Sequence, residues 1–150
     1  MDTIDIVIRK YNIRRQCEVA EIYINGVNLI DLVAAVERPF ATAEGHPELA
    51  GQYQGLPADL AFLPSTYLLE GEYEKTALLV CSCGAVGCWP MEAKITVQED
   101  VVIWSDFEQP HRGPDSHQHW RYDDFGPFVF DRQQYLSSLA ERPIVYEYQG

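Results

Sequence analysis

Apolar or aromatic residues recur at every second position near both ends of the chain. Residues 3–9 carry isoleucine at every second position, which predicts a half-buried strand. Residues 18–24 predict a second strand, antiparallel to the first. Residues 144–148 place apolar and aromatic side chains on one side and predict a closing strand.

The best-patterned stretch is KITVQEDVVIW, residues 94–104, in which two β-branched apolar runs flank Gln-Glu-Asp. This pattern predicts a β-hairpin. A two-residue turn at Glu99-Asp100 pairs Gln98 with Val101, and a longer turn with a shifted register is the alternative. Under the first register one apolar face, the expected core side, is formed by Trp89, Met91, Ala93, Ile95, Val97, Val102 and Trp104.

Upstream of this hairpin, residues 76–83 predict a further strand, followed by a glycine-bounded loop. A four-residue loop sets Cys83 opposite Cys88, and the returning third strand sets His111 opposite Cys88. The central segment is thus expected to be a three-stranded meander. Cys81, Cys83, Cys88 and His111 are expected to converge at one of its corners.

Four interpretations of that corner remain open. Three cysteines and one histidine form a known tetrahedral zinc set, although the spacing CxCx4C differs from the paired CxxC of common zinc modules. Free cysteines more commonly pack as small apolar side chains. A Cys83–Cys88 disulfide or redox pair is the third interpretation. The fourth is a nucleophilic Cys88 with His111 as its base.

Two helices are expected. Asn28 is a good N-cap for an apolar stripe that Pro39 ends. Asp131 and Gln134 resemble a capping box for a second helix, which Pro143 stops. The stripe of the first helix is Leu29, Leu32, Val33 and Val36. The buried face of the second is Tyr135, Leu136 and Leu139.

The segment that follows the hairpin holds three of the four histidines. His117 and His119 point the same way in an extended chain and, with a neighbouring aspartate, suggest a nitrogen and oxygen metal site. The alternative is a polar loop that Trp120 anchors.

Composition indicates one ordinary globular domain over residues 1–150, with 47% hydrophobic and 12% aromatic residues. No apolar run approaches the length of about 20 residues that a membrane-spanning helix needs. The first residues are acidic and alternating, so a secretory leader is not expected. We therefore expect a cytoplasmic location, where cysteines stay reduced.

The formal net charge is −12, from 23 acidic and 11 basic residues. Such a charge repels phosphate backbones and anionic membranes, so we expect neither nucleic acid nor a membrane as partner. It favours a basic protein partner, although simple solubility is the commoner reason for net charge.

Three blocks, CSCGAVGCWPMEAKI, VVIWSDFEQPHR and GPFVFDRQQY, together resemble a family of small uncharacterised bacterial proteins with a CxCGxxGCWP-type segment. The resemblance spans residues 78–135. It implies a compact bacterial domain, and it implies no activity, cofactor or catalytic residue.

These observations predict an α+β fold: an antiparallel sheet built on the central meander, with two helices on one face. Glycine-rich phosphate loops, HExxH and GxSxG are missing from the sequence, so we lean away from an enzyme. The leading expectation is a non-enzymatic, acidic protein-binding module of the immunity or adaptor kind. The alternative is a zinc-binding or cysteine-dependent protein that uses Cys81, Cys83, Cys88 and His111.

Overall fold

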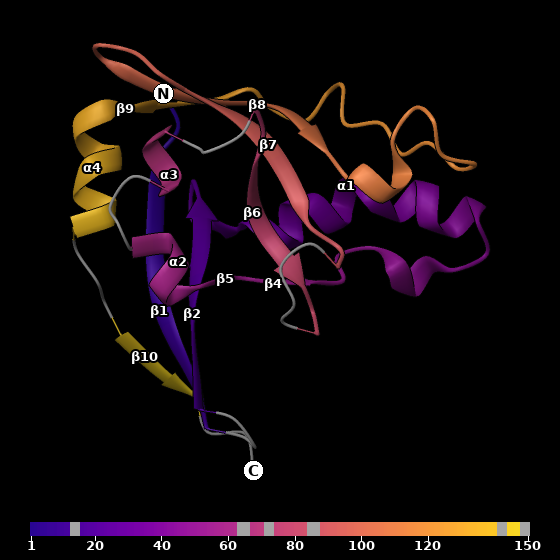
Figure 1. The fold of residues 1–150 in the computed structure, drawn as a ribbon, viewed down its shortest axis with the longest axis horizontal. Helices are drawn as coiled ribbons and strands as arrows, with labels where there is room; N and C mark the ends of the chain where they lie inside the picture. Colours follow the sequence, from indigo (N-terminus) through magenta and orange to yellow (C-terminus); the bar gives the residue numbers. More distant parts are fainter. Residues whose placement is uncertain (13–15, 63–66, 71–73, 84–87, 141–143, 148–150) are drawn as a thin grey trace.

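The chain forms two β-sheets flanked by helices (Figure 1). The structure is a computed structural model, and it describes residues 1–12, 16–62, 67–70, 74–83, 88–140 and 144–147. In the first sheet the order is β10-β1-β2-β3, and β5 also pairs with β2. In the second sheet the order is β4-β6-β7-β8-β9. The first comprises β1 (Ile4–Asn12), β2 (Gln16–Ile24), β3 (Val27–Asn28), β5 (Leu56–Pro57) and β10 (Ile144–Glu147). The second comprises β4 (Tyr53–Gln54), β6 (Thr76–Cys81), β7 (Met91–Val97), β8 (Val101–Glu108) and β9 (Phe128–Asp131).

The first sheet confirms the strands expected at the two ends of the chain. β1 and β2 pair antiparallel, and β10 lies parallel to β1 on its other side. The alternating isoleucines Ile4, Ile6 and Ile8 of β1 face the core, and none is more than 6% exposed. The sheet therefore buries the side that the period-two pattern indicated.

The second sheet contains the predicted meander, β6-β7-β8, in the predicted hairpin register. Ile95 pairs with Trp104, and the amide of Gln98 donates to the carbonyl of Val101 at 2.8 Å across the two-residue turn. The register then shifts by one residue at a bulge, where Asp106 adopts a positive φ of 53°. The bulge changes the partners of every residue nearer the cysteine end of the hairpin.

Trp104 lies at the centre of the core that the two sheets share. Its ring meets Phe130 and Tyr135 edge to face, with centroids 5.1 and 6.0 Å apart. Its indole N–H donates to the Tyr135 hydroxyl at 3.2 Å, and that hydroxyl donates to the carbonyl of Leu68. Each buried polar atom of these two aromatic side chains therefore has a partner, as burial requires.

Helix α1 (Leu29–Ala43) begins where expected and ends later than expected. The Asn28 side chain caps it by accepting the amide of Ile30 at 2.9 Å. The prediction that Pro39 ends the helix is wrong, because Pro39 lies inside it. Buried side chains recur every fourth residue through Glu37 and Ala41, so packing continues past the proline and offsets its missing hydrogen bond. Pro39 itself is on the exposed side.

Helix α4 (Arg132–Ala140) confirms half of the predicted capping box. The Asp131 carboxylate accepts the amide of Gln134 at 3.0 Å. The Gln134 side chain does not reach back to Asp131. Instead it accepts the amide of Ile4 at 3.0 Å and donates to the carbonyl of Ile4 at 2.6 Å. The helix is thus docked on β1, and this orientation leaves Leu136 39% exposed, contrary to its predicted burial.

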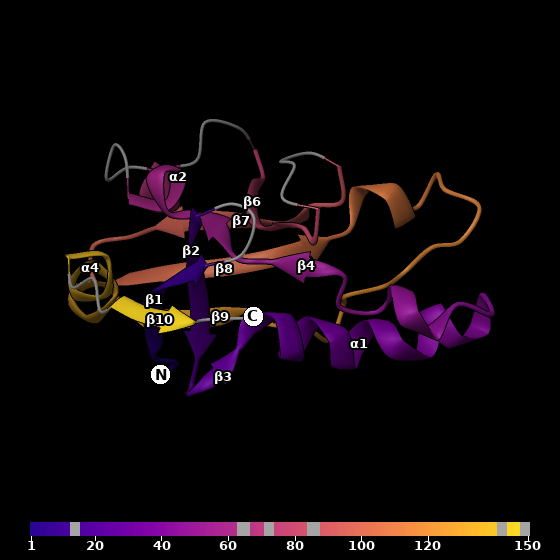
Figure 2. The same cartoon turned by 90° about the horizontal axis from the view of Figure 1, so that it is seen from below.

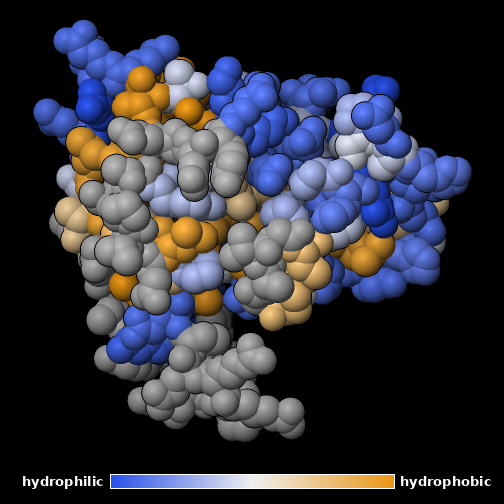
Figure 3. Space-filling view, viewed as in Figure 1, coloured by the Kyte–Doolittle hydropathy of each residue, from blue (hydrophilic) through white to orange (hydrophobic). Residues whose placement is uncertain are grey.

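The remaining helical segments are short: α2 (Ala58–Phe62), α3 (Tyr67–Glu70) and the 3₁₀ turns η1 (Pro47–Leu49) and η2 (Pro110–Arg112). Figures 1 and 2 show the two longer helices, α1 and α4, at opposite ends of the molecule. The α+β class is confirmed. On the face shown in Figure 3, the end that carries α1 is mainly hydrophilic, and apolar side chains gather toward the α4 end.

Candidate metal centre

Three cysteine sulfurs converge beyond the ends of β6 and β7. Cys81 is the last residue of β6, and Cys88 lies three residues before β7 begins. The Sγ atoms of Cys81, Cys83 and Cys88 all lie within 4.8 Å of one another. The backbone amide of Cys83 donates to Cys81 Sγ at 3.5 Å. The predicted convergence of the three thiols is therefore present, although neither strand extends far enough for Cys83 to pair with Cys88 as predicted.

This arrangement is compatible with a thiolate-bound metal ion. Tetrahedral zinc with Zn–S bonds of about 2.3 Å requires sulfur atoms about 3.8 Å apart, which small side-chain rotations reach from the observed separations. Thiolates prefer soft or borderline-soft ions such as zinc. The N–H···S bond from Cys83 to Cys81 also stabilises negative charge on the sulfur that accepts it.

The structure bears on the other three interpretations of the cysteines. Cys83 and Cys88 are exposed, so packing against apolar neighbours does not account for their positions. Cys81 and Cys88 are free thiols, so neither forms the disulfide of the third interpretation. Hydrogen bonds to Cys81 and Cys83, and the charges on those sulfurs, raise the pKa of Cys88 to about 11. The base that the nucleophile interpretation requires, His111, is outside the group of close ligand atoms and stacks on Trp89.

His111 does not belong to the sulfur cluster. Within the described residues the group of mutually close ligand atoms contains the three cysteines alone. β8 ends at Glu108 after its bulge, and His111 lies in η2 instead of continuing the ladder opposite Cys88. Its ring stacks on Trp89, parallel within 1° and with centroids 5.6 Å apart. The bulge, which the alternating pattern does not reveal, and Pro110, whose missing amide donor is visible in the sequence, explain why the prediction for this residue was wrong.

Trp89 belongs to an aromatic and charged cluster that the sequence analysis did not identify. The Arg112 guanidinium lies over the rings of Trp89 and Trp120, at 5.0 and 5.5 Å from their centroids. Glu44, at the C-cap of α1, accepts Arg112 Nε at 3.1 Å and the Trp120 indole N–H at 2.8 Å. The cluster fastens the loop after β8 to α1 and confirms Trp120 as the anchor of that loop. Among the described side chains, the indole N–H of Trp89 is enclosed without a hydrogen-bond partner.

A buried glutamate is linked to the cysteine cluster through strand β4. Glu37 is 0% exposed, and its carboxylate accepts the hydroxyls of Tyr53 and Tyr122 at 2.5 and 2.6 Å and the amide of Gly51 at 2.9 Å. Desolvation raises its pKa, which these hydrogen bonds partly oppose. Tyr53 belongs to β4 and pairs directly with Cys81 of β6. The network therefore positions the first cysteine through one pair of residues in the sheet.

The second predicted metal set is not assembled among the described residues. His117 and His119 are both exposed, and neither belongs to a group of close metal-ligating atoms. The alternative interpretation, a polar loop with one buried tryptophan, describes this segment: Trp120 is only 2% exposed.

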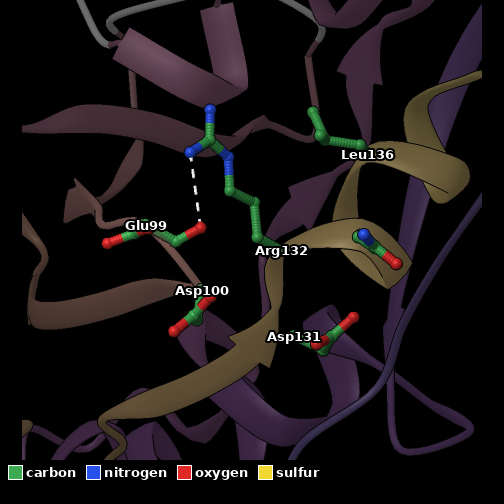
Figure 4. A pocket seen from close by; sticks show the side chains of 6 residues that line it. Glu99, Asp100, Asp131, Arg132 and Leu136 are labelled. Atoms are coloured by element: carbon green, nitrogen blue, oxygen red, sulfur yellow. Dashed lines mark hydrogen bonds between the residues drawn. The ribbon is translucent and has the colours of Figure 1, made fainter.

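An acidic pocket of about 480 Å³ lies between the turn of the β7–β8 hairpin and the first turn of α4 (Figure 4). Arg132 crosses it and donates to the carbonyls of Gln98 and Glu99 at 3.3 and 3.5 Å. The acidic side chains around it are exposed to solvent. The lining residues are Glu99, Asp100, Asp131, Arg132, Gln133 and Leu136.

Comparison with protein-family models, with curated proteins and with solved structures finds no match to this chain. No helix among the described residues is long and apolar enough to cross a membrane.

Proposed function

We propose that the protein binds one zinc ion through the thiolates of Cys81, Cys83 and Cys88. The observation that carries the proposal is the convergence of three sulfurs within 4.8 Å at a place where two of the thiols are exposed. Exposed cysteines gain little from apolar packing, so burial does not explain their clustering. A bound cation does, because it offsets the mutual repulsion of neighbouring thiolates.

The position of the cluster suggests what the metal would stabilise. Cys81 ends β6, and Cys88 precedes β7, so one ion joins the two sides of the β6–β7 connection. Metal that binds only the folded arrangement adds its binding free energy to folding. We therefore expect the metal to stabilise the open end of the central meander.

Zinc stoichiometry tests the proposal directly. Protein without a histidine tag, purified under reducing conditions and dialysed against a trace-metal buffer, is expected to retain close to one zinc per chain. Cys81→Ser, Cys83→Ser and Cys88→Ser should each weaken zinc binding about tenfold or more, because each removes one of three sulfur ligands.

Cys17→Ser is the matched control. Cys17 lies in β2 of the first sheet, where its backbone pairs with Tyr11 of β1, whereas Cys81 belongs to the second sheet. This variant should retain zinc at the level of the unsubstituted protein. Zinc well below stoichiometric in the reduced protein, or equal losses in Cys17→Ser and Cys88→Ser, would contradict the proposal.

A second proposed function, an acidic module that binds a basic protein partner, draws support from the pocket in Figure 4. The exposed carboxylates of Glu99, Asp100 and Asp131 line the pocket together with Leu136, and the whole chain carries a net charge of −12. A lysine or arginine side chain can place its methylenes on such a surface and its charge among the carboxylates.

A lysine-rich peptide of about ten residues tests this second function by calorimetry at two salt concentrations. Glu99→Gln with Asp100→Asn should weaken binding about tenfold at low salt, because both charges lie within reach of the bound cation. Asp123→Asn with Asp124→Asn changes the net charge equally at exposed positions elsewhere. Equal losses in the two double variants would show that net charge alone attracts the peptide and would reject the pocket as its site.

A further inference from the structure

We propose that the fourth coordination position of this metal stays open to a neutral external donor, water at rest and an imidazole nitrogen when one is offered. This inference rests on the proposed zinc binding by Cys81, Cys83 and Cys88. It assigns the centre to the open class of zinc sites, which bind exogenous ligands, and not to the closed structural class.

The cysteine cluster supplies three ligand atoms. Tetrahedral zinc takes four ligands, and within the described part of the chain no histidine nitrogen, carboxylate oxygen or further cysteine sulfur joins the group of three close sulfurs. The loop between Cys83 and Cys88 is Gly-Ala-Val-Gly in sequence, so its side chains offer no ligand atom.

The cysteine cluster is accessible to solvent. Cys83 and Cys88 are exposed, and Cys81 is only partly covered. A metal held by these sulfurs therefore has solvent beside it. Structural zinc sites gain their permanence from four protein ligands, whereas an exposed site with three exchanges its remaining ligand with the solution.

The backbone of His111 is held by hydrogen bonds on both sides. Its amide donates to the Gln109 side chain at 3.1 Å, and its carbonyl accepts Arg112 Nη1 at 3.1 Å. Its ring is stacked on Trp89. His111 is therefore held in η2 outside the group of close ligand atoms, and turning its ring toward the sulfurs would break the stacking on Trp89.

Charge selects the class of external ligand. Zinc with three thiolates carries a net charge of −1, and the whole chain has a net charge of −12. A further anion is repelled by both, whereas a neutral nitrogen or oxygen donor is not. Imidazole combines neutrality with the borderline softness that zinc prefers, so a histidine side chain of another molecule is the ligand that best fits the open position.

Cobalt(II) substitution tests the inference, because the visible bands of tetrahedral cobalt report its ligands. Cobalt-loaded protein should show thiolate charge-transfer bands, and imidazole should shift the visible bands saturably as one molecule binds. Azide, an anionic donor, should bind at least about tenfold more weakly. His111→Ala should leave both the spectrum and the cobalt affinity unchanged within about twofold, as should the exposed control His117→Ala.

The possible outcomes separate the two proposals. Cobalt bands that imidazole does not shift, together with a changed spectrum in His111→Ala or Cys17→Ser, would show that the chain supplies the fourth ligand and would overturn this inference alone. Azide binding as tight as imidazole binding would overturn the choice of a neutral donor. Failure of the reduced protein to bind cobalt or zinc would overturn the metal site itself and this inference with it.

Discussion

Replacement of Gly51 by alanine should destabilise the protein strongly, because two independent constraints meet at this residue. Gly51 has a φ of +75°, and a Cβ added to it would lie 2.7 Å from the Cβ of Ala34 in α1. Its amide also donates to the buried carboxylate of Glu37. Any backbone movement that relieves the clash therefore lengthens a hydrogen bond to a buried acceptor.

The size of the effect follows from these terms. An L-residue at positive φ costs about 1–2 kcal/mol, and overpacking against helix α1 costs about 1–3 kcal/mol. The lower entropy of the unfolded alanine chain returns about 0.4–1 kcal/mol. We expect the free energy of unfolding to fall by about 2–4 kcal/mol, measured by urea denaturation at neutral pH.

Gly45→Ala is the matched control, because Gly45 has a φ of +83° and no atom within 4 Å of the added Cβ. It should show the backbone cost alone, about 1 kcal/mol. Adding Ala34→Gly to Gly51→Ala should recover the steric part of the loss. Equal destabilisation by the two single variants would refute the steric argument. Gly51→Ala should also weaken zinc binding, because Gly51 holds Glu37 and, through Tyr53, the strand beside Cys81.

Three further predictions concern the docking of α4 and the buried network. Gln134→Ala should lower the free energy of unfolding by about 1–3 kcal/mol, since both backbone groups of Ile4 lose their partner, whereas the exposed Gln133→Ala should change it by less than about 0.5 kcal/mol. Burial and the nearby Glu37 charge raise the pKa of Tyr122 above its usual value of 10.0, so the folded chain keeps the phenol proton longer than the unfolded chain. The free energy of unfolding should therefore fall as the pH rises above about 10. Tyr122→Phe should make this fall less steep by up to about 1.4 kcal/mol per pH unit, measured by urea denaturation at alkaline pH. An equally steep fall in the variant would count against the burial of this hydroxyl. The raised pKa of Glu37 makes its contribution largest below the unfolded value of 4.5 and smaller as pH rises through the folded pKa. The stability of the unsubstituted protein relative to Glu37→Gln should thus decline as the pH rises above the unfolded value of 4.5, and a rise instead would contradict the sign of the shift.

The cysteine cluster and the Glu37 network share a single piece of structure, the short strand β4. Tyr53 donates to Glu37 and pairs with Cys81, and the amide of Ser82 donates to the carbonyl of Gln52. Ligand orientation in metal sites depends on such supporting contacts. The buried carboxylate is therefore linked to the cysteine cluster through β4.

Local sequence determined those features that depend on neighbouring residues. The alternation of residues 94–104 and the short turn determine the hairpin register, because a slip of one residue would turn the apolar face toward solvent. Asn28 and Asp131 cap their helices as expected, since a cap needs only a side-chain acceptor beside free backbone amides. Sequence spacing also predicted that Cys81, Cys83 and Cys88 would meet.

Tertiary structure alone decided the features that depend on distant segments. Helix α1 continues through Pro39 because Glu37 and Ala41 pack against strands and loops far away in sequence. The bulge at Asp106 moves His111 out of the predicted ladder and onto Trp89, which leaves three thiols without the fourth ligand that the spacing suggested. In the sequence, Glu37 looks like a surface residue of a helix. It becomes the buried centre of a network only because donors from β4, Gly51 and the loop after β8 approach it. Hydrogen bonds over such separations are set by how the sheets and helices pack, and no local pattern encodes them.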